Sequence, residues 1–153
     1  MDNKKIKNAT PKEYNGIKFK SLLEVMVYKT LLQEGFTPLY EPMKYIIWKG
    51  FKPEVPFYRP DKKGSLQLQN TKIIDITYTP DFVFVAPDNK TVVIIECKGF
   101  QNDVSPIKEK MFRGYLENVL KDENQPRLFF KIKNKKQCLE AIEIINNTCK
   151  NEE

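Results

Sequence analysis

The sequence predicts a single-domain α/β (α+β) protein in which helices flank a mixed central sheet. A chain of 153 residues suits one domain with a hydrophobic core of its own. Apolar residues recur at three- and four-residue spacing in three separate stretches, as they do in helices. Short runs rich in Val, Ile, Phe and Tyr lie between these stretches and are typical of strands. The predicted element order is αβββαβα within one domain over residues 1–153.

The first helix is expected over residues 21–34, with Ser21 as its N-cap and Gly35 after its last turn. The polar and basic residues 1–15 before it are expected to be a flexible N-terminus. Residues 39–48, which are rich in Tyr and Ile, are expected to form the first strand.

Two apolar runs, 72–85 and 91–97, flank the segment 86–90, whose composition is typical of a hairpin turn. Ser105 and Pro106 then provide an N-cap and a first helical residue. Ile107, Met111, Tyr115 or Leu116, Val119 and Leu120 continue this second helix at helical spacing. A short strand over 128–133 and a last helix over 135–147 complete the order.

Residues 49–70 contain Pro53, Pro56, Pro60 and Gly64, so the sequence predicts a long irregular insertion there. Aromatic residues alternate in it with Arg59, Lys62 and Lys63. That combination suits stacking on unpaired DNA bases while the basic groups contact the backbone. Packing of the same aromatic residues against the protein's own core is an equal alternative.

Composition excludes several classes of protein. The chain has no histidine, which removes the Ser-His and Cys-His triads and the commonest zinc ligand. Its three cysteines are far apart, so neither disulfides nor a zinc site is expected, and a reducing cytoplasm fits. No apolar run approaches the roughly 18 residues of a membrane span. The net charge of +6 favours a polyanionic partner such as DNA.

The hairpin contains a pair of acidic residues in register. If it turns on Asp88 and Asn89, Asp81 falls opposite Glu96, and opposed residues of an antiparallel pair project to the same face. Two carboxylates so placed repel each other unless a divalent cation lies between them, and Mg²⁺ or Mn²⁺ is the expected ion. Lys98 lies two residues beyond Glu96 and therefore shares its face.

These three side chains form a group that can hold a metal, orient a water and counter the charge on a phosphate during in-line attack. A purely structural explanation is also open: Asp81 could cap a turn after Pro80, and Glu96 and Lys98 could form a solvent-facing strand end.

Glu24 also has two interpretations. Ser21 to Glu24 has a capping-box pattern, in which the glutamate binds the amide of Ser21. Glu24 also precedes Val27, Tyr28 and Leu31 on the apolar stripe, so it is expected to project toward the sheet and to have a catalytic role.

The sequence resembles the PD-(D/E)XK nucleases and, among them, the phage endonuclease I type of Holliday junction resolvase. The resemblance rests on the stretches FKSLLE (19–24), YE (40–41), YTPDF (78–82) and IECKG (95–99), in that order, and covers about two thirds of the chain. The predicted order agrees with the restriction-endonuclease-like αβββαβ core of that family.

The resemblance implies that Glu24, Asp81, Glu96 and Lys98 are catalytic, with Asp81 and Glu96 as metal ligands. Glu24 would assist a second metal or its water, and Lys98 would be the charged partner of the attacking water. It also implies a homodimer that cuts the two strands of branched DNA symmetrically during recombination, in a bacterial or phage-infected cell.

Three further basic residues, Lys108, Lys110 and Arg113, follow the active strand and are candidates to bind phosphates beside the scissile bond. An ordinary solvated helix face is an equal alternative for each. Two other functions stay open for the chain as a whole. One is a duplex-cutting nuclease of restriction, repair or transposition, and the other is a nucleic-acid-binding module without turnover.

Overall fold

The computed structural model describes residues 11–98, 104–118 and 125–151. Its centre is a mixed four-stranded sheet with the strand order β10-β9-β8-β3. Strand β10 runs parallel to β9, and the other two pairs are antiparallel. The strands are β3 (Leu39–Tyr40), β8 (Phe82–Val85), β9 (Val92–Cys97) and β10 (Arg127–Ile132).

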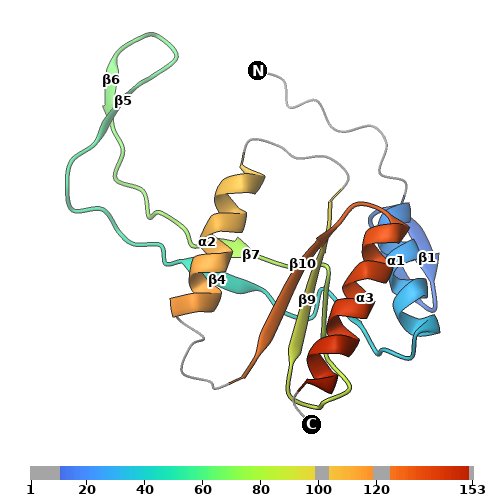
Figure 1. Ribbon diagram of the computed structural model, residues 1–153. Coiled ribbons are helices and arrows are strands. Elements are labelled where there is room, and N and C mark those ends of the chain that lie inside the picture. Colours follow the sequence, from blue (N-terminus) through green and yellow to red (C-terminus); the bar gives the residue numbers. More distant parts are fainter. Residues whose placement is uncertain (1–10, 99–103, 119–124, 152–153) are drawn as a thin grey trace.

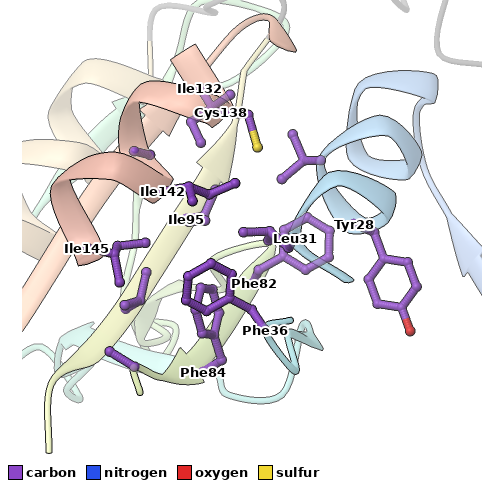
Figure 2. Packing of buried hydrophobic residues seen from close by; sticks show 14 of the residues in the cluster. Tyr28, Leu31, Phe36, Phe82, Phe84, Ile95, Ile132, Cys138, Ile142 and Ile145 are labelled. Carbon is purple, nitrogen blue, oxygen red and sulfur yellow. The ribbon is translucent and has the colours of Figure 1, made fainter. Parts of the chain in front are cut away.

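Helices cover both faces of this sheet (Figure 1). Helices α1 (Leu22–Gln33) and α3 (Lys135–Lys150) lie over one face, and α2 (Ser105–Asn118) lies over the other. Alternate strand residues point to opposite faces. Phe82 and Ile95 therefore pack under α1 and α3, as Figure 2 shows, while Val83 and Ile94 pack on the side of α2. The expected mixed α/β fold with flanking helices is confirmed.

The order of the elements around this sheet is the predicted one. Along the chain they follow as α1, β3, β8, β9, α2, β10 and α3. Ser21 caps α1 by accepting a hydrogen bond from the N–H of Glu24, and Gly35 follows the helix with φ of +86°. Helix α2 begins at Ser105 itself, one residue before the expected start. Val119 and Leu120, which were expected to extend it, lie outside the described residues.

Two expected strands are each divided, which corrects the prediction. The segment 39–48 forms β3 and β4 (Tyr45–Trp48), because Glu41 has φ of +44° and Pro42 follows it. The segment 72–85 forms β7 (Ile76–Tyr78) and β8, and Pro80, which has no N–H to donate, lies between them. Strands β4 and β7 pair with each other in a separate two-stranded sheet.

The expectation of a flexible N-terminus over 1–15 is wrong for its described part. Strands β1 (Lys12–Tyr14) and β2 (Ile17–Phe19) form an antiparallel hairpin. Its two turn residues, Asn15 and Gly16, have φ of +50° and +74°, as this kind of tight turn requires. Residues 1–10 lie outside the described part of the chain.

The expected irregular insertion also contains regular structure. Residues 51–74, here called the arm, carry a hairpin of β5 (Tyr58–Pro60) and β6 (Leu66–Leu68) that stands away from the helices (Figure 1). The Asp61 carboxylate accepts the N–H groups of Lys63 and Ser65 and thereby orders the tip. Composition alone missed this hairpin because its turn is built by a side chain.

The ends of the arm meet at its base. Phe51 and Ile73 exchange two backbone hydrogen bonds of 2.9 and 2.8 Å, and the Gly50 N–H donates to the Asp75 carboxylate at 2.7 Å. A Cβ atom at residue 50 would overlap the backbone of Ile73 and Ile74, so only glycine fits there. Among the described residues, no helix is long and apolar enough to span a membrane.

Candidate active site

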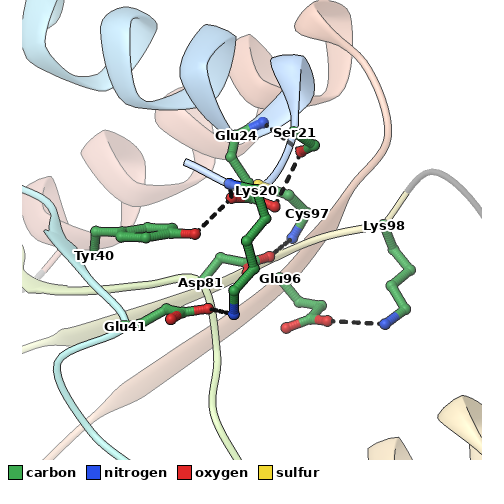
Figure 3. Close-up of polar contacts among 9 residues, drawn as sticks. All are labelled: Lys20, Ser21, Glu24, Tyr40, Glu41, Asp81, Glu96, Cys97 and Lys98. Carbon is green, nitrogen blue, oxygen red and sulfur yellow. Dashed lines mark hydrogen bonds and ion pairs between the residues drawn. The ribbon is translucent and has the colours of Figure 1, made fainter. Parts of the chain in front are cut away.

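The hairpin of β8 and β9 has the register that was predicted for a turn on Asp88 and Asn89. Phe82 pairs with Ile95, and each following pair keeps this alignment. One step beyond Phe82, Asp81 therefore lies opposite Glu96. Its carboxylate Oδ2 accepts the backbone N–H of Cys97 at 2.6 Å, which holds the side chain against β9 (Figure 3).

Both opposed carboxylates have raised pKa values, and the charge of Glu96 contributes to the shift at Asp81. Burial, followed by the negative charge of Glu96, raises the pKa of Asp81 to about 8. Burial also raises the pKa of Glu96, although the nearby Lys98 acts in the opposite direction. The Oε2 atom of Glu96 is buried without a hydrogen-bond partner in the described part of the chain. Lys98 compensates the other oxygen of this carboxylate, but a buried polar atom without a partner is costly, so this position favours an additional cation.

Lys98 lies where the period of a strand places it. Its Nζ is 3.3 Å from Oε1 of Glu96, so the expected common face is confirmed. Tyr78, Glu96, Lys98, Ser105 and Lys108 are among the residues that line a pocket of about 240 Å³. Burial and the charge of Glu96 raise the pKa of the Tyr78 hydroxyl, which therefore stays protonated at neutral pH. The pocket thus joins an acid, two ammonium groups and a phenol.

Glu24 is buried at the start of α1, and both of its oxygens are hydrogen-bonded. Oε2 accepts the Lys20 N–H at 2.9 Å and the Tyr40 hydroxyl at 2.8 Å, and Oε1 accepts the Ser21 hydroxyl at 3.0 Å. This is a variant of the capping box in which the N–H of Lys20 takes the place of the N–H of Ser21. The helix-capping role is therefore present, and a role toward a second metal stays a prediction.

Over residues 11–98, 104–118 and 125–151, no three His, Cys, Asp or Glu side chains are grouped so that they could hold a metal ion by themselves. The physical reason is that Glu24 lies on α1, which covers one face of the central sheet, whereas Glu96 projects to the opposite face. Asp81 and Glu96 nevertheless fit Mg²⁺ or Mn²⁺. Such ions commonly use one or two carboxylates and complete their shell with water and substrate phosphate. The unpartnered Glu96 oxygen is the observation that supports this fit.

Sequence analysis did not assign Glu41, Lys20 or Lys131 to the site. Glu41 donates its backbone N–H to the Asp81 carbonyl at 2.8 Å, and its carboxylate binds the Lys20 ammonium. A left-handed glutamate is unusual, and such strain is concentrated at functional sites. The sequence feature that could have indicated Glu41 is a charged residue directly before Pro42. Lys131 lies beside Glu96 in the parallel register, which only the strand pairing reveals.

The predicted DNA-binding residues are only partly brought together. Lys108 lines the pocket with Glu96, whereas Arg113 lines a second one of about 530 Å³ with Lys131 and Glu109. Lys110 is exposed on α2. The remaining candidates are exposed on the arm, namely Arg59, Lys62 and Lys63.

The arm's aromatic residues are also exposed. Phe57 and Tyr58 are each 55% exposed, so the alternative that they pack against the protein's own core is wrong. Arg59 lies over the ring of Phe57.

Comparison of the chain with protein-family models, with curated proteins and with solved structures gave no match. The geometry of the described residues is therefore what supports a function.

Proposed function

We propose that this protein is a metal-dependent DNA endonuclease of the PD-(D/E)XK type. The observation that carries the proposal is the opposed pair of Asp81 and Glu96, whose mutual repulsion and unpartnered oxygen favour a divalent cation. The adjacent ammonium of Lys98 completes the set of groups that phosphodiester hydrolysis needs. The order of elements around the central sheet supports the same restriction-endonuclease-like core.

In this proposal Asp81 and Glu96 hold Mg²⁺ or Mn²⁺, which would supply Lewis-acid activation of the phosphate and of a water. The Cys97 N–H orients the Asp81 carboxylate, and Lys98 orients Glu96. Lys98 also positions the attacking water and counters charge on the phosphate as it develops. Glu24 assists a second metal or its water. Lys108, in the same pocket, binds a neighbouring phosphate.

The substrate in this proposal is branched DNA, cut by a homodimer with one active centre for each strand. A purified sample is offered a four-way junction and a matched linear duplex, first with Mg²⁺ and then with EDTA. We expect junction cleavage only with Mg²⁺ and slower cleavage of the duplex. Equal cleavage of both substrates would favour the duplex-cutting alternative, and DNA binding without any cleavage would favour the non-catalytic module.

The arm offers a second contact with DNA, because its hairpin exposes Arg59 on β5 and Lys62 and Lys63 at the tip, while Asp61 is engaged in the turn. Replacing the three basic residues with Ala is expected to weaken DNA binding by about tenfold. It should also reduce the dependence of binding on salt by about one to three counterions. The cleavage rate at saturating DNA should be unchanged, because no residue of the arm lines the pocket that contains Glu96 and Lys98.

Fluorescence anisotropy over a range of salt concentrations measures both effects. The matched control is a triple variant in which three exposed lysines of α3 are replaced with Ala, namely Lys135, Lys136 and Lys150. Helix α3 lies over the face of the sheet opposite to α2. Equal losses in the two triple variants would show that general charge, and not the arm, determines binding.

A further inference from the structure

Lys20 links two acidic residues of the site from different elements. Its backbone N–H donates to Oε2 of Glu24 on α1, and its ammonium forms an ion pair with Glu41, which follows β3 (Figure 3). The Lys20 side chain is 68% exposed, whereas that of Glu41 is 25% exposed. Lys20 is therefore held by charge and not by packing.

Glu41 connects this lysine to Asp81. The Glu41 N–H donates to the Asp81 carbonyl, and the residue keeps a left-handed backbone in doing so. Figure 3 shows the Lys20 side chain extending past Asp81 to Glu41. The negative charges of Glu41, Asp81 and Glu24 all raise the pKa of Lys20, and the hydrogen bond to Glu41 is the largest cause.

The carboxylates thus have a lysine on each side. Lys98 pairs with Glu96 at one end of the group, and Lys20 pairs with Glu41 at the other. Lys98 directly follows the sheet strand β9 and its side chain is 27% exposed, whereas the Lys20 side chain is 68% exposed and extends to its ion pair with Glu41. Of the two lysines, Lys20 is therefore the one that can move away from the carboxylates when a divalent cation binds.

We propose that Lys20 is a resident counter-cation, which neutralises the Glu24, Glu41 and Asp81 side of the site in the metal-free protein and opposes the binding of a divalent ion. This inference rests on the proposed metal centre. An ammonium near a carboxylate repels an incoming divalent cation, and part of that repulsion persists even at an exposed site. The released ammonium is then available to a DNA phosphate.

The test is a calorimetric titration of the full-length protein with Mn²⁺ alone, without DNA. Lys20→Met is expected to bind Mn²⁺ about tenfold more tightly than the wild type, because one opposing charge is lost. Lys20→Arg, which keeps the charge, should bind Mn²⁺ as the wild type does. Lys18→Met removes an exposed lysine from β2, the strand that directly precedes Lys20, and should also leave the affinity unchanged.

A second measurement separates this role from a merely structural one. The metal-free Lys20→Met protein should unfold at a lower temperature than the wild type at neutral pH, and Mn²⁺ should remove this difference. A structural role alone would lower the unfolding temperature with and without Mn²⁺. Lys20→Gln provides the same loss of charge with a polar side chain if the Met variant does not fold.

The outcomes distinguish the two proposals. If the wild type binds Mn²⁺ and Lys20→Met binds it equally or more weakly, the counter-cation role is wrong and the metal centre stands. If the wild type and Glu96→Gln give the same heat on titration, or none, the metal centre itself is wrong and the role of Lys20 with it.

Discussion

Replacing Asp81 with Asn is expected to reduce DNA cleavage by about a thousandfold or more while the protein still folds. Asparagine keeps an oxygen that can accept the Cys97 N–H, so the local hydrogen bond is retained. It removes one of the two opposed negative charges on which the proposed cation site depends. Glu96→Gln should have the same effect on cleavage, because it removes the other charge.

The same two variants should bind DNA as well as the wild type or better, since a negative charge beside the phosphate is lost. Initial cleavage rates and DNA affinity measured in parallel therefore separate catalysis from binding. Glu140→Gln, which changes an exposed carboxylate on α3, is the matched control and should cut normally. Normal cutting by Asp81→Asn and Glu96→Gln would remove the basis for the candidate site.

The second large effect concerns pH. The pKa of Asp81 is about 8 in the folded protein against an ordinary value of 3.8, so the folded state holds this proton more tightly than the unfolded state does. A raised carboxyl pKa stabilises the protein at low pH, and this stability is lost as pH rises from about 4 to about 8. The raised pKa of Glu96 acts in the same direction.

The metal-free protein should therefore unfold at a temperature several degrees lower at about pH 8 than at about pH 5, which corresponds to about 1 kcal/mol or more. Mg²⁺ or Mn²⁺ should reduce this difference, because it binds the ionised carboxylates. Thermal unfolding with EDTA and with Mg²⁺ measures both effects. Asp81→Asn should have a flatter pH profile, and a profile as steep as that of the wild type would place the titrating group elsewhere.

The part of the site that follows from local periodicity was predictable from the sequence. The period of two residues in a strand placed Lys98 beside Glu96, and the Asp88–Asn89 turn placed Asp81 opposite Glu96. These inferences need only one hairpin. Pro80 was visible in the sequence, yet the apolar character of 72–85 concealed that it divides the segment between two sheets.

The other part of the site depends on pairings between distant segments. Lys131 comes beside Glu96 because β10 pairs in parallel with β9, and such a register is not encoded in either strand alone. Glu41 reaches Asp81 through a left-handed backbone conformation that a glutamate rarely adopts. Lys20 reaches the group through its ion pair with Glu41. The places of both residues in the site therefore depend on this one backbone conformation, which the sequence does not reveal.

The closed base of the arm has a consequence for how such a protein can be altered. Because Gly50 and Asp75 are already bonded to each other and Phe51 is paired with Ile73, the chain leaves and re-enters the body at almost the same point. A short turn could replace everything between these contacts without moving β4 or β7. The arm is in this sense an interchangeable part, and under the proposed function substrate preference could change through it while the proposed catalytic groups stay fixed.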